Sequence, residues 1–462
     1  MRILKRGAGL SERFRSVVSS SFVRSVGLLA GSTAVAQVIL GATLPIATRL
    51  YSPHDFSLLA VFAAMTSLLS VSICLRYDIA VALPEKAEDG AALVVLSVGL
   101  TLFFSALIAL PVLIAPAWSA ALIGQPAMAP VLWLLPVACL LAGAYSALQF
   151  WNVRDKAFSI LAKNRVAQAT FSSMCQISLG LARAGPIGLI LGQTISMGGG
   201  ALLLGYRFMA KGDAARGASW PRICEMARQY KRFPAFSTIE AFSNSAGLYF
   251  PIILLGAFAE KSEAGFVALA MYGLQLPMTL LGNAVSQVYV SQGPAELRAG
   301  RLPAFTIKVL SGLMKTGVGP LICLAIVASP LFKLVFGPDW TRAGYLVMWM
   351  TPWFVFQFLA SPLSLTLHIS NRLALAMGLQ IFGAVLRTAS VMLAYYLPEQ
   401  PFSVSYALSG MVFYICFLAI ILRSIRVSLK SVFQAAAGAL PICAGWVILG
   451  FFGLEILKLI KM

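Results

Sequence analysis

The chain has 462 residues, of which 59% are hydrophobic and 11% charged, and its formal net charge is +19. Soluble globular domains carry about 25% charged residues, so this composition excludes a soluble protein and predicts a polytopic membrane protein. The basic residues lie in the gaps between apolar runs, where membrane topology and anionic lipid headgroups account for them. We therefore expect anionic membrane lipids as partners, and no nucleic acid.

Residues 1–23 are basic, and Leu10, Phe14 and Val17 recur in them at helical spacing. This pattern favours an interfacial segment on the cytoplasmic face. No small-residue cleavage site follows a short apolar core, so we expect the first span to remain uncleaved.

Apolar runs of the length that a helix needs to cross a bilayer, about 20 residues, recur along the chain. Twelve of them lie at 24–48, 56–83, 90–115, 129–150, 165–183, 185–207, 236–257, 264–290, 309–332, 343–366, 373–396 and 403–422. A further run at 435–457 is too short for two crossings and could form a thirteenth. The fold class predicted is an all-α membrane protein with twelve core transmembrane helices.

Lysine and arginine are distributed unequally between the two sides that these runs define. With the N-terminus inside, the outer connections hold only Arg49, Arg183, Lys261, Lys333 and Arg342, and most of the other basic residues fall inside. This alternation follows the positive-inside rule across all twelve runs. Lys458 and Lys461 would lie outside if 435–457 crosses the membrane, which is an objection to a thirteenth span.

The longest and most basic connection, 208–235, lies midway and separates an N-terminal six-helix bundle at 24–207 from a C-terminal one at 236–422. A basic linker and an extra apolar helix follow at 423–462. Each half has an even number of spans, so both enter the membrane in the same orientation. Such parallel repeats form two bundles with a cleft between them.

A repeated pattern supports this division into halves. Trp and Pro in the fourth span precede an Asn-Arg pair, and the tenth span repeats the arrangement. The matching positions are Trp133, Pro136, Asn164 and Arg165 in the first half, and Trp349, Pro352, Asn371 and Arg372 in the second.

The hairpin at residues 42–85 holds a short polar turn and a second apolar run, which nears the membrane face at Arg76 and Asp78. Charges at that depth are costly unless they are paired or face water. We interpret Arg76 and Asp78 as a structural charge pair, with a substrate contact as the alternative. Arg49, at the outer end of the first span, either guards the mouth of a cavity or anchors the helix end.

Motifs of enzymes are missing from the sequence. It contains no paired carboxylates on one helix face, no GxSxG, no glycine-rich phosphate loop and no HExxH. Seven cysteines are scattered singly and only two histidines occur, so we expect no metal site, no cofactor and no disulfide framework. The protein is therefore expected not to be an enzyme.

Arg387 lies near the middle of the run 373–396, where an arginine costs about 2.5–3.5 kcal/mol on insertion scales. It must face a partner or a wet cavity. We interpret it as an anion site in the cleft, because a guanidinium binds phosphate oxygens bidentately; a structural pair with Glu240 is the alternative. Lys315 either adds positive potential to the cleft or snorkels to the cytoplasmic face.

Uncharged polar residues inside the spans suit a hydrated lumen that hydrogen-bonds sugar hydroxyls. Those assigned to substrate binding are Gln37, Asn244, Asn283 and Gln287. Glu240 could be a proton or sodium site that couples transport to an ion gradient. Its alternative role is that of an interfacial carboxylate paired with Lys231 or Arg232.

Several of these segments resemble the bacterial oligosaccharide flippases, which are polysaccharide transporters of the multidrug/oligosaccharidyl-lipid/polysaccharide (MOP) exporter superfamily. The segments are Arg49–Phe56, Leu75–Pro84, Tyr230–Pro234, Gly265–Ala270 and Phe336–Gly344. The resemblance implies two six-helix bundles in a V that opens alternately to each face. It also implies an undecaprenyl-pyrophosphate-linked oligosaccharide as substrate. Met271 and Tyr272 stand where the family often has Gln-Arg, so a pyrophosphate contact made by that arginine would fall to Arg387 here.

We therefore expect a flippase that moves this substrate from the cytoplasmic to the periplasmic leaflet of the bacterial inner membrane for surface polysaccharide assembly. A polysaccharide polymerase and chain-length machinery are the expected protein partners. A MATE-type drug/cation antiporter is the first alternative, but it would need acidic residues in the cleft, where the chain offers only Glu240 and Asp78. A membrane glycosyltransferase or polysaccharide polymerase is the second, and it would need larger outer loops.

Overall fold

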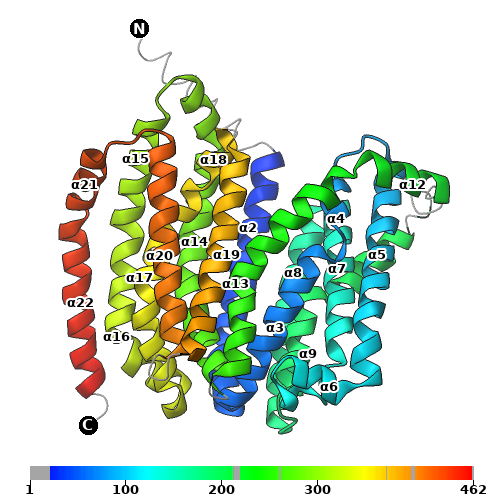
Figure 1. Ribbon diagram of the computed structural model, residues 1–462, viewed down its shortest axis with the longest axis horizontal. Helices are drawn as coiled ribbons and strands as arrows, with labels where there is room; N and C mark the ends of the chain where they lie inside the picture. Colours follow the sequence, from blue (N-terminus) through cyan, green and yellow to red (C-terminus); the bar gives the residue numbers. More distant parts are fainter. Residues whose placement is uncertain are drawn as a thin grey trace.

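The computed structural model describes residues 21–210, 212, 219–259, 262–370, 372–396 and 401–459. Regular secondary structure in these residues is helical throughout, and the long helices run side by side (Figure 1). The interfacial segment expected before residue 21 lies outside the described part of the chain.

The helices of the first half surround α7 and α9. They are α2 (Ser21–Leu50), α3 (Pro53–Ile73), α4 (Tyr77–Ala80), α5 (Ala87–Ile114), α6 (Pro116–Leu122), the short helix η1 (Pro126–Met128), α7 (Leu134–Arg154), α8 (Phe158–Leu181), α9 (Ile187–Gly198) and α10 (Gly200–Ala210). The connection to the second half contains α12 (Trp220–Gln229) and a π-helical turn η2 (Phe233–Ser237).

The second half surrounds α17, which packs against α14, α16 and α20. Its helices are α13 (Thr238–Phe258), α14 (Glu263–Arg298), α15 (Leu302–Leu313), η3 (Met314–Val318), α16 (Gly319–Phe336), η4 (Pro338–Trp340), α17 (Thr341–Leu363), α18 (Leu365–Ile369), α19 (Leu373–Tyr396), α20 (Phe402–Ser424), α21 (Leu429–Ala437) and α22 (Leu440–Leu459).

Every predicted apolar run coincides with a helix. By length and composition, 11 helices of the described residues could cross a membrane, and α22 is one of them. The helices α8 and α14, of 24 and 36 residues, cover two further predicted runs. The positions of Lys458 and Lys461 argue against a thirteenth span, whereas the 20 residues of α22 match the hydrocarbon thickness of a bilayer and favour one.

Some predicted runs are not single helices: η3 lies within the run 309–332, and the boundary between α17 and α18 lies within the run 343–366. Two further runs are also divided. The run 56–83 breaks after Ile73, because Leu75 and Arg76 adopt φ angles of 48° and 60°, in the left-handed region that L-residues rarely populate. The run 185–207 breaks at Gly199, between α9 and α10. Apolar composition alone contains no signal for either break.

The two halves contact each other at the end of the molecule that holds Pro53, Gly265 and Trp340, which we call the joined end (lower edge of Figure 1). A Cβ atom at Gly265 would lie 2.6 Å from the carbonyl oxygen of Pro53. A Gln125 side chain from the first half also donates a hydrogen bond to the carbonyl of Gly256. Glycine therefore allows backbone-to-backbone contact between the halves here.

Trp340 fixes the same contact from the second half. Its indole is 1% exposed, and its Nε1–H donates to the carbonyl oxygen of Thr48 at 3.0 Å. The ring packs edge-on against Phe56, with centroids 4.8 Å apart, and against Phe266 at 5.9 Å. A single aromatic side chain thereby joins α2, α3 and α14.

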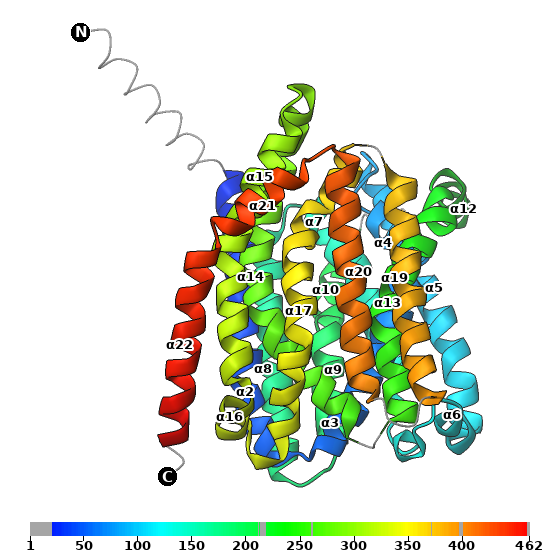
Figure 2. The ribbon, with the colours of Figure 1, turned by 60° about the vertical axis from the view of Figure 1, so that its left-hand side comes forward.

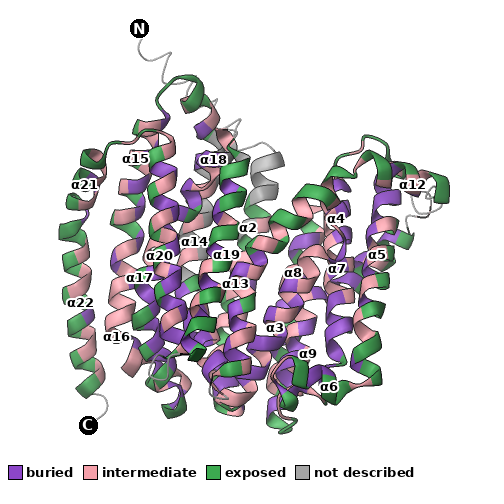
Figure 3. Cartoon of the chain, in the orientation of Figure 1, coloured by how far each residue is buried: buried purple, intermediate pink, exposed green. Residues whose placement is uncertain are grey.

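The last helix pair lies at the edge of the bundle. Figure 2 shows α22 on the outside, next to α16, and Figure 3 shows that most of its surface is exposed. Where Gly319 faces α22, the indole of Trp446 fills the space that a Cβ would need. The exposed face of α22 includes Ile448, Phe451 and Phe452, as expected for side chains that contact lipid.

Replacing Trp340 by Ala should lower the free energy of unfolding by about 3–5 kcal/mol, the usual effect of emptying a buried aromatic site. Thermal unfolding of the purified protein in detergent measures this change. Trp349→Ala is the matched control, because that indole is 38% exposed on α17, the helix that directly follows η4. Equal melting temperatures for the two variants would contradict the assignment of Trp340 to the contact between halves.

Candidate functional site

A polar cavity lies between α14 and α17, in the second half. Its volume is about 200 Å³. It is lined by Gln275, Met278, Gly282 and Ser286 of α14 and by Gln357, Phe358, Ser361 and Pro362 of α17. The α14 residues recur every three or four positions, which places them on one face of the helix.

The lining offers neutral hydrogen-bonding groups and apolar surface, without a charged residue. The Oε1 atom of Gln357 is buried and has no hydrogen-bond partner among the described residues. A buried acceptor without a partner needs an explanation, such as a ligand or a water molecule that donates to it. Amide and hydroxyl groups beside an apolar wall are suited to bind a hydroxyl-rich molecule.

This cavity lies well away from the joined end. Along α14, Gln275 and Ser286 are about 15 and 32 Å beyond Gly265 at 1.5 Å rise per residue. α14 is also one of the helices of the second half that pack directly on α3 of the first half. A molecule in the cavity would therefore contact a helix whose other end forms the contact between halves.

Arg387 is 1% exposed and lies between α13, α19 and α20. Its Nε–H donates to the Gly383 carbonyl at 2.9 Å, and its guanidinium lies 4.7 Å from the ring centroid of Phe413. The Nη2 atom is 2.7 Å from where a Cβ would stand at Gly247. Nη1 is buried without a hydrogen-bond partner in the described part of the chain.

In this conformation α13 covers the guanidinium, and the assignment of Arg387 as an anion site in the cleft stays a prediction. The alternative, a pair with Glu240, is not observed, since Glu240 is exposed in the first turn of α13 and no ion pair joins the two among the described contacts. Arg387 is a buried cation stabilised by an aromatic ring and one backbone carbonyl, with the Tyr414 side chain as a further polar partner.

Arg49 and Lys315 lie at opposite ends of the molecule. Arg49 is exposed at the joined end and donates from Nη2 to the Leu334 carbonyl at 3.2 Å, so it links the halves. Lys315 is exposed on η3 and faces α21, with its Cε 3.7 Å from where a Cβ would stand at Gly438. Neither lines the α14–α17 cavity.

The uncharged residues predicted to bind substrate are not gathered at one place. Gln37 is half-buried on α2, and Asn244 is exposed on α13. Asn283 and Gln287 are in α14, next to the cavity residues Gly282 and Ser286, but their side chains lie outside the described part of the structure. Two of the predicted residues therefore lie next to cavity residues on α14, and Gln357, which lines the cavity, was not among those predicted.

Arg76 and Asp78 do not form the expected ion pair within the described residues. Asp78 is 5% exposed, and its Oδ2 accepts a hydrogen bond of 2.5 Å from the Ser146 hydroxyl of α7. Arg76 caps α4 at its N-terminus with φ 60°. The break between α3 and α4 directs Asp78 toward α7, and this backbone turn is the reason that the pair is absent.

An ion pair with a buried carboxylate, at the start of α14, was not predicted from the sequence. The guanidinium of Arg342, in the first turn of α17, donates to both carboxylate oxygens of Glu263 at 2.6 and 2.9 Å. Ser403, at the start of α20, donates to the same carboxylate, which is 4% exposed. Glu263 also lies at the N-terminus of α14, where the helix dipole favours an anion. The signal for this pair in the sequence was Glu263, an acidic residue directly before the predicted run 264–290.

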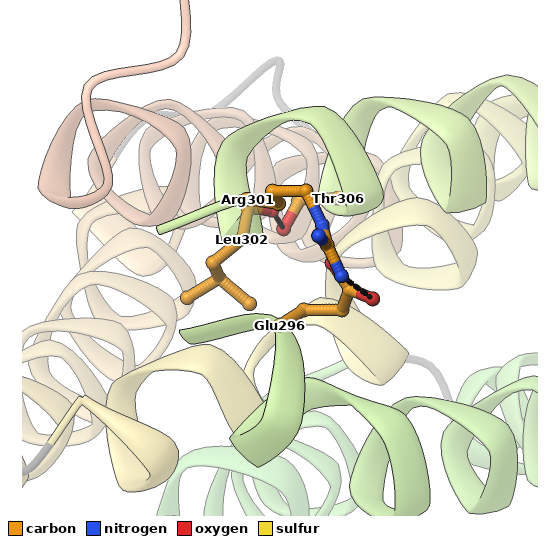
Figure 4. A network of polar contacts seen from close by, with 4 residues as sticks. All are labelled: Glu296, Arg301, Leu302 and Thr306. Carbon is orange, nitrogen blue, oxygen red and sulfur yellow. Dashed lines mark hydrogen bonds and ion pairs between the residues drawn. The ribbon is translucent and has the colours of Figure 1, made fainter. Parts of the chain in front are cut away.

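The turn between α14 and α15 is fixed by a second pair, shown in Figure 4. Arg301 Nε–H donates to the Glu296 carboxylate at 3.0 Å, and this hydrogen bond holds the pKa of the Glu296 carboxyl below its ordinary value. Thr306 donates to the Leu302 carbonyl at 2.8 Å and shares a 2.7 Å hydrogen bond with Tyr289 of α14. α14 and α15 are thus held together at the end opposite the joined end.

Replacing Arg387 by Met should raise the free energy of unfolding by about 1–2 kcal/mol, the difference between the insertion cost of a central arginine and its attraction to an aromatic ring. The melting temperature in detergent measures this change. Arg423→Met, at the exposed end of α20, is the control for loss of one charge. A melting temperature below that of the control would instead make the guanidinium a net stabiliser of α13, α19 and α20.

Structures of known proteins share this fold. The lipid II flippase MurJ, in an inward closed conformation, matches with a TM-score of 0.70 at 12% identity, over 94% of this chain and 97% of that chain. A multidrug-resistance MATE family transporter of the MOP superfamily, in an inward-facing conformation, matches with a TM-score of 0.56 at 14% identity, over 86% and 94%. Similarity at this identity establishes the two-lobed MOP fold alone.

The sequence comparisons identify the family. No curated protein matches the sequence. A family model described as polysaccharide biosynthesis protein matches residues 46–344, which extend from the joined end of α2 to the first turn of α17 and make up more than half of the chain. The chain is a member of the polysaccharide biosynthesis protein family and is a polytopic helical protein with the MOP fold.

Proposed function

We propose that the protein is a flippase that moves an undecaprenyl-pyrophosphate-linked oligosaccharide from the cytoplasmic to the periplasmic leaflet. The observation that supports this most directly is the neutral, hydrogen-bonding cavity between α14 and α17, in a chain whose family belongs to polysaccharide biosynthesis. Glutamine and serine side chains can exchange hydrogen bonds with sugar hydroxyls, and Phe358 offers an apolar wall to a sugar ring.

The orientation proposed has a cytoplasmic N-terminus in a bacterial inner membrane. The excess of lysine and arginine in alternate connections supports it. In this orientation the joined end is periplasmic, so the halves are in contact on the outer side. The substrate would then enter from the cytoplasmic leaflet, with its prenyl tail in lipid and its polar headgroup between the halves.

Movement of α13 would complete the transport step. This helix lies between α3 of one half and α19 of the other. It contains Gly247 and Pro251, and the π-helical turn η2 directly precedes it. Proline and π-turns weaken helical hydrogen bonding and allow bending. A bend that moves Gly247 away from Arg387 would expose the guanidinium to the space between the halves, where it could bind the pyrophosphate.

A drug/cation antiporter on the same fold is less well supported. Such a site needs acidic side chains, and neither α14 nor α17 contributes one to the described cavity. Glu263 is engaged by Arg342 and Ser403, and Asp78 by Ser146. Glu240 remains the proposed ion-coupling residue. A polysaccharide polymerase and chain-length proteins are the proposed partners in the membrane.

Gly282→Leu tests the cavity. Gly282 lines it, and a Cβ there would meet no atom within 4 Å, so leucine should fill the cavity without disturbing the helix. We expect at least about a tenfold loss of the translocation rate, corresponding to about 1.4 kcal/mol. The rate is measured with purified protein in vesicles, from the movement of a fluorescent prenyl-pyrophosphate oligosaccharide between leaflets.

Gly99→Leu is the matched control, since Gly99 lies on α5 of the first half and also has no atom within 4 Å of a Cβ. A wild-type rate for Gly282→Leu would show that the α14–α17 cavity does not bind the headgroup. Absence of any translocation by the wild-type protein, with sugars of several compositions, would contradict the flippase function itself.

A further inference from the structure

A second cavity, of about 530 Å³, lies at the periphery of the second half, between α15, η3 and α21. It is lined by Ile307, Lys308, Ser311, Gly312 and Lys315 on one side and by Ser431, Gln434 and Ala435 on the other. None of these residues lines the α14–α17 cavity. We call it the α15–α21 groove.

Its shape follows from the sequence of α15. Lys308 of α15 and Lys315 of the following π-helical turn η3 are seven residues apart, about 10 Å along the axis at 1.5 Å per residue, and both line the groove. Between them stand Ser311 and Gly312, and a Cβ at Gly312 would meet no atom within 4 Å. Small side chains thus form the floor of the groove, with an ammonium group at each end.

No acidic side chain among the described residues compensates the charge of the groove. No acidic residue lines it, and neither lysine takes part in an ion pair among the described residues. Ser311, Ser431 and Gln434 add hydrogen-bonding groups between the two ammonium groups. Such a set is suited to bind a phosphate group.

The position of Lys315 relative to the membrane comes from two helices. From Lys315 to Phe336, the last residue of α16, is about 32 Å at 1.5 Å per residue, close to the hydrocarbon thickness of a bilayer. Lys315 also lies 3.7 Å from where a Cβ would stand at Gly438, two residues before the apolar helix α22 begins at Leu440. Both measures place Lys315 at the boundary between hydrocarbon and headgroups.

The other wall of the groove is suited to the same boundary. α21 carries exposed Leu429 and Phe433, at 76% and 73%, together with Lys430. A short helix with exposed apolar side chains and a nearby lysine is typical of one that lies in the plane of a membrane interface. Phosphate groups of lipids are the anions that are abundant at this depth.

We propose that the α15–α21 groove binds the phosphate of an anionic phospholipid between Lys308 and Lys315, while the acyl chains lie on the exposed apolar surface below. This site is separate from the transported substrate. It gives a role to α21 and α22, which fix the lipid against α15 and lie outside the residues that match the family model.

The test uses the full-length protein, purified and titrated with phosphatidylglycerol or phosphatidylcholine, with bound lipid counted by native mass spectrometry. We expect a clear preference for phosphatidylglycerol. Lys308→Gln combined with Lys315→Gln should weaken it about twenty-five-fold, because a basic residue near an anionic lipid surface contributes about fivefold. Gly312→Leu should weaken it with both charges retained, by filling the groove.

The control is Lys86→Gln combined with Lys231→Gln, which removes two exposed positive charges from other connections. Equal weakening by this control would overturn the proposal, since the binding would then depend on total charge. So would the absence of a preference for phosphatidylglycerol in the wild-type protein. Displacement of the lipid by inorganic pyrophosphate at equal concentration would overturn the assignment to a lipid headgroup and indicate a soluble phosphate ligand.

Discussion

The contact between the two halves at the joined end is the constraint on which the rest of the structure depends. Gly265 lies against the backbone of Pro53, and Trp340 donates a hydrogen bond across the same contact to Thr48. The hydrogen bond joins atoms 3.0 Å apart, and the backbone of Pro53 leaves no room for a Cβ at Gly265, so both contacts exist only while the halves meet at this end. The Glu263–Arg342 ion pair lies beside them and ties the starts of α14 and α17. The cavity between those two helices is therefore built on elements whose positions the contact determines.

The burial of Arg387 is the second constraint on the structure. A cation buried with one unsatisfied nitrogen costs free energy, and replacing it with an apolar side chain would remove that cost. The enclosing surfaces are Gly247 on one side and Phe413 on the other, and Gly247 belongs to the helix that lies between the halves. If α13 bends as we propose, an arginine covered by this helix would bind an anion in one conformation and be enclosed in the other.

The sequence was sufficient to predict the spans and the division of polarity between them, because a 20-residue apolar run and its flanking charges are local properties. It was insufficient wherever the outcome depends on which helix faces which. Arg387 was correctly recognised as exceptional, but its burial depends on α13, which lies more than a hundred residues away in the sequence. Arg76 and Asp78 were assigned to each other because they are neighbours, and a left-handed turn at Arg76 separated them. Gln357 was one polar residue among many until its unsatisfied oxygen was located beside α14.

Neutral polar side chains and lysines therefore line different sites of the second half. Neutral amides and hydroxyls line the α14–α17 cavity, where a fixed charge would be costly without a partner. Lysines line the α15–α21 groove, at Lys308 and Lys315, for which we propose a position at the headgroup boundary. A transporter for a sugar headgroup benefits from this separation, because neutral groups bind hydroxyls weakly enough for release on the other side. A strongly basic cavity would retain a pyrophosphate, whereas a single arginine that is covered in one conformation can release it.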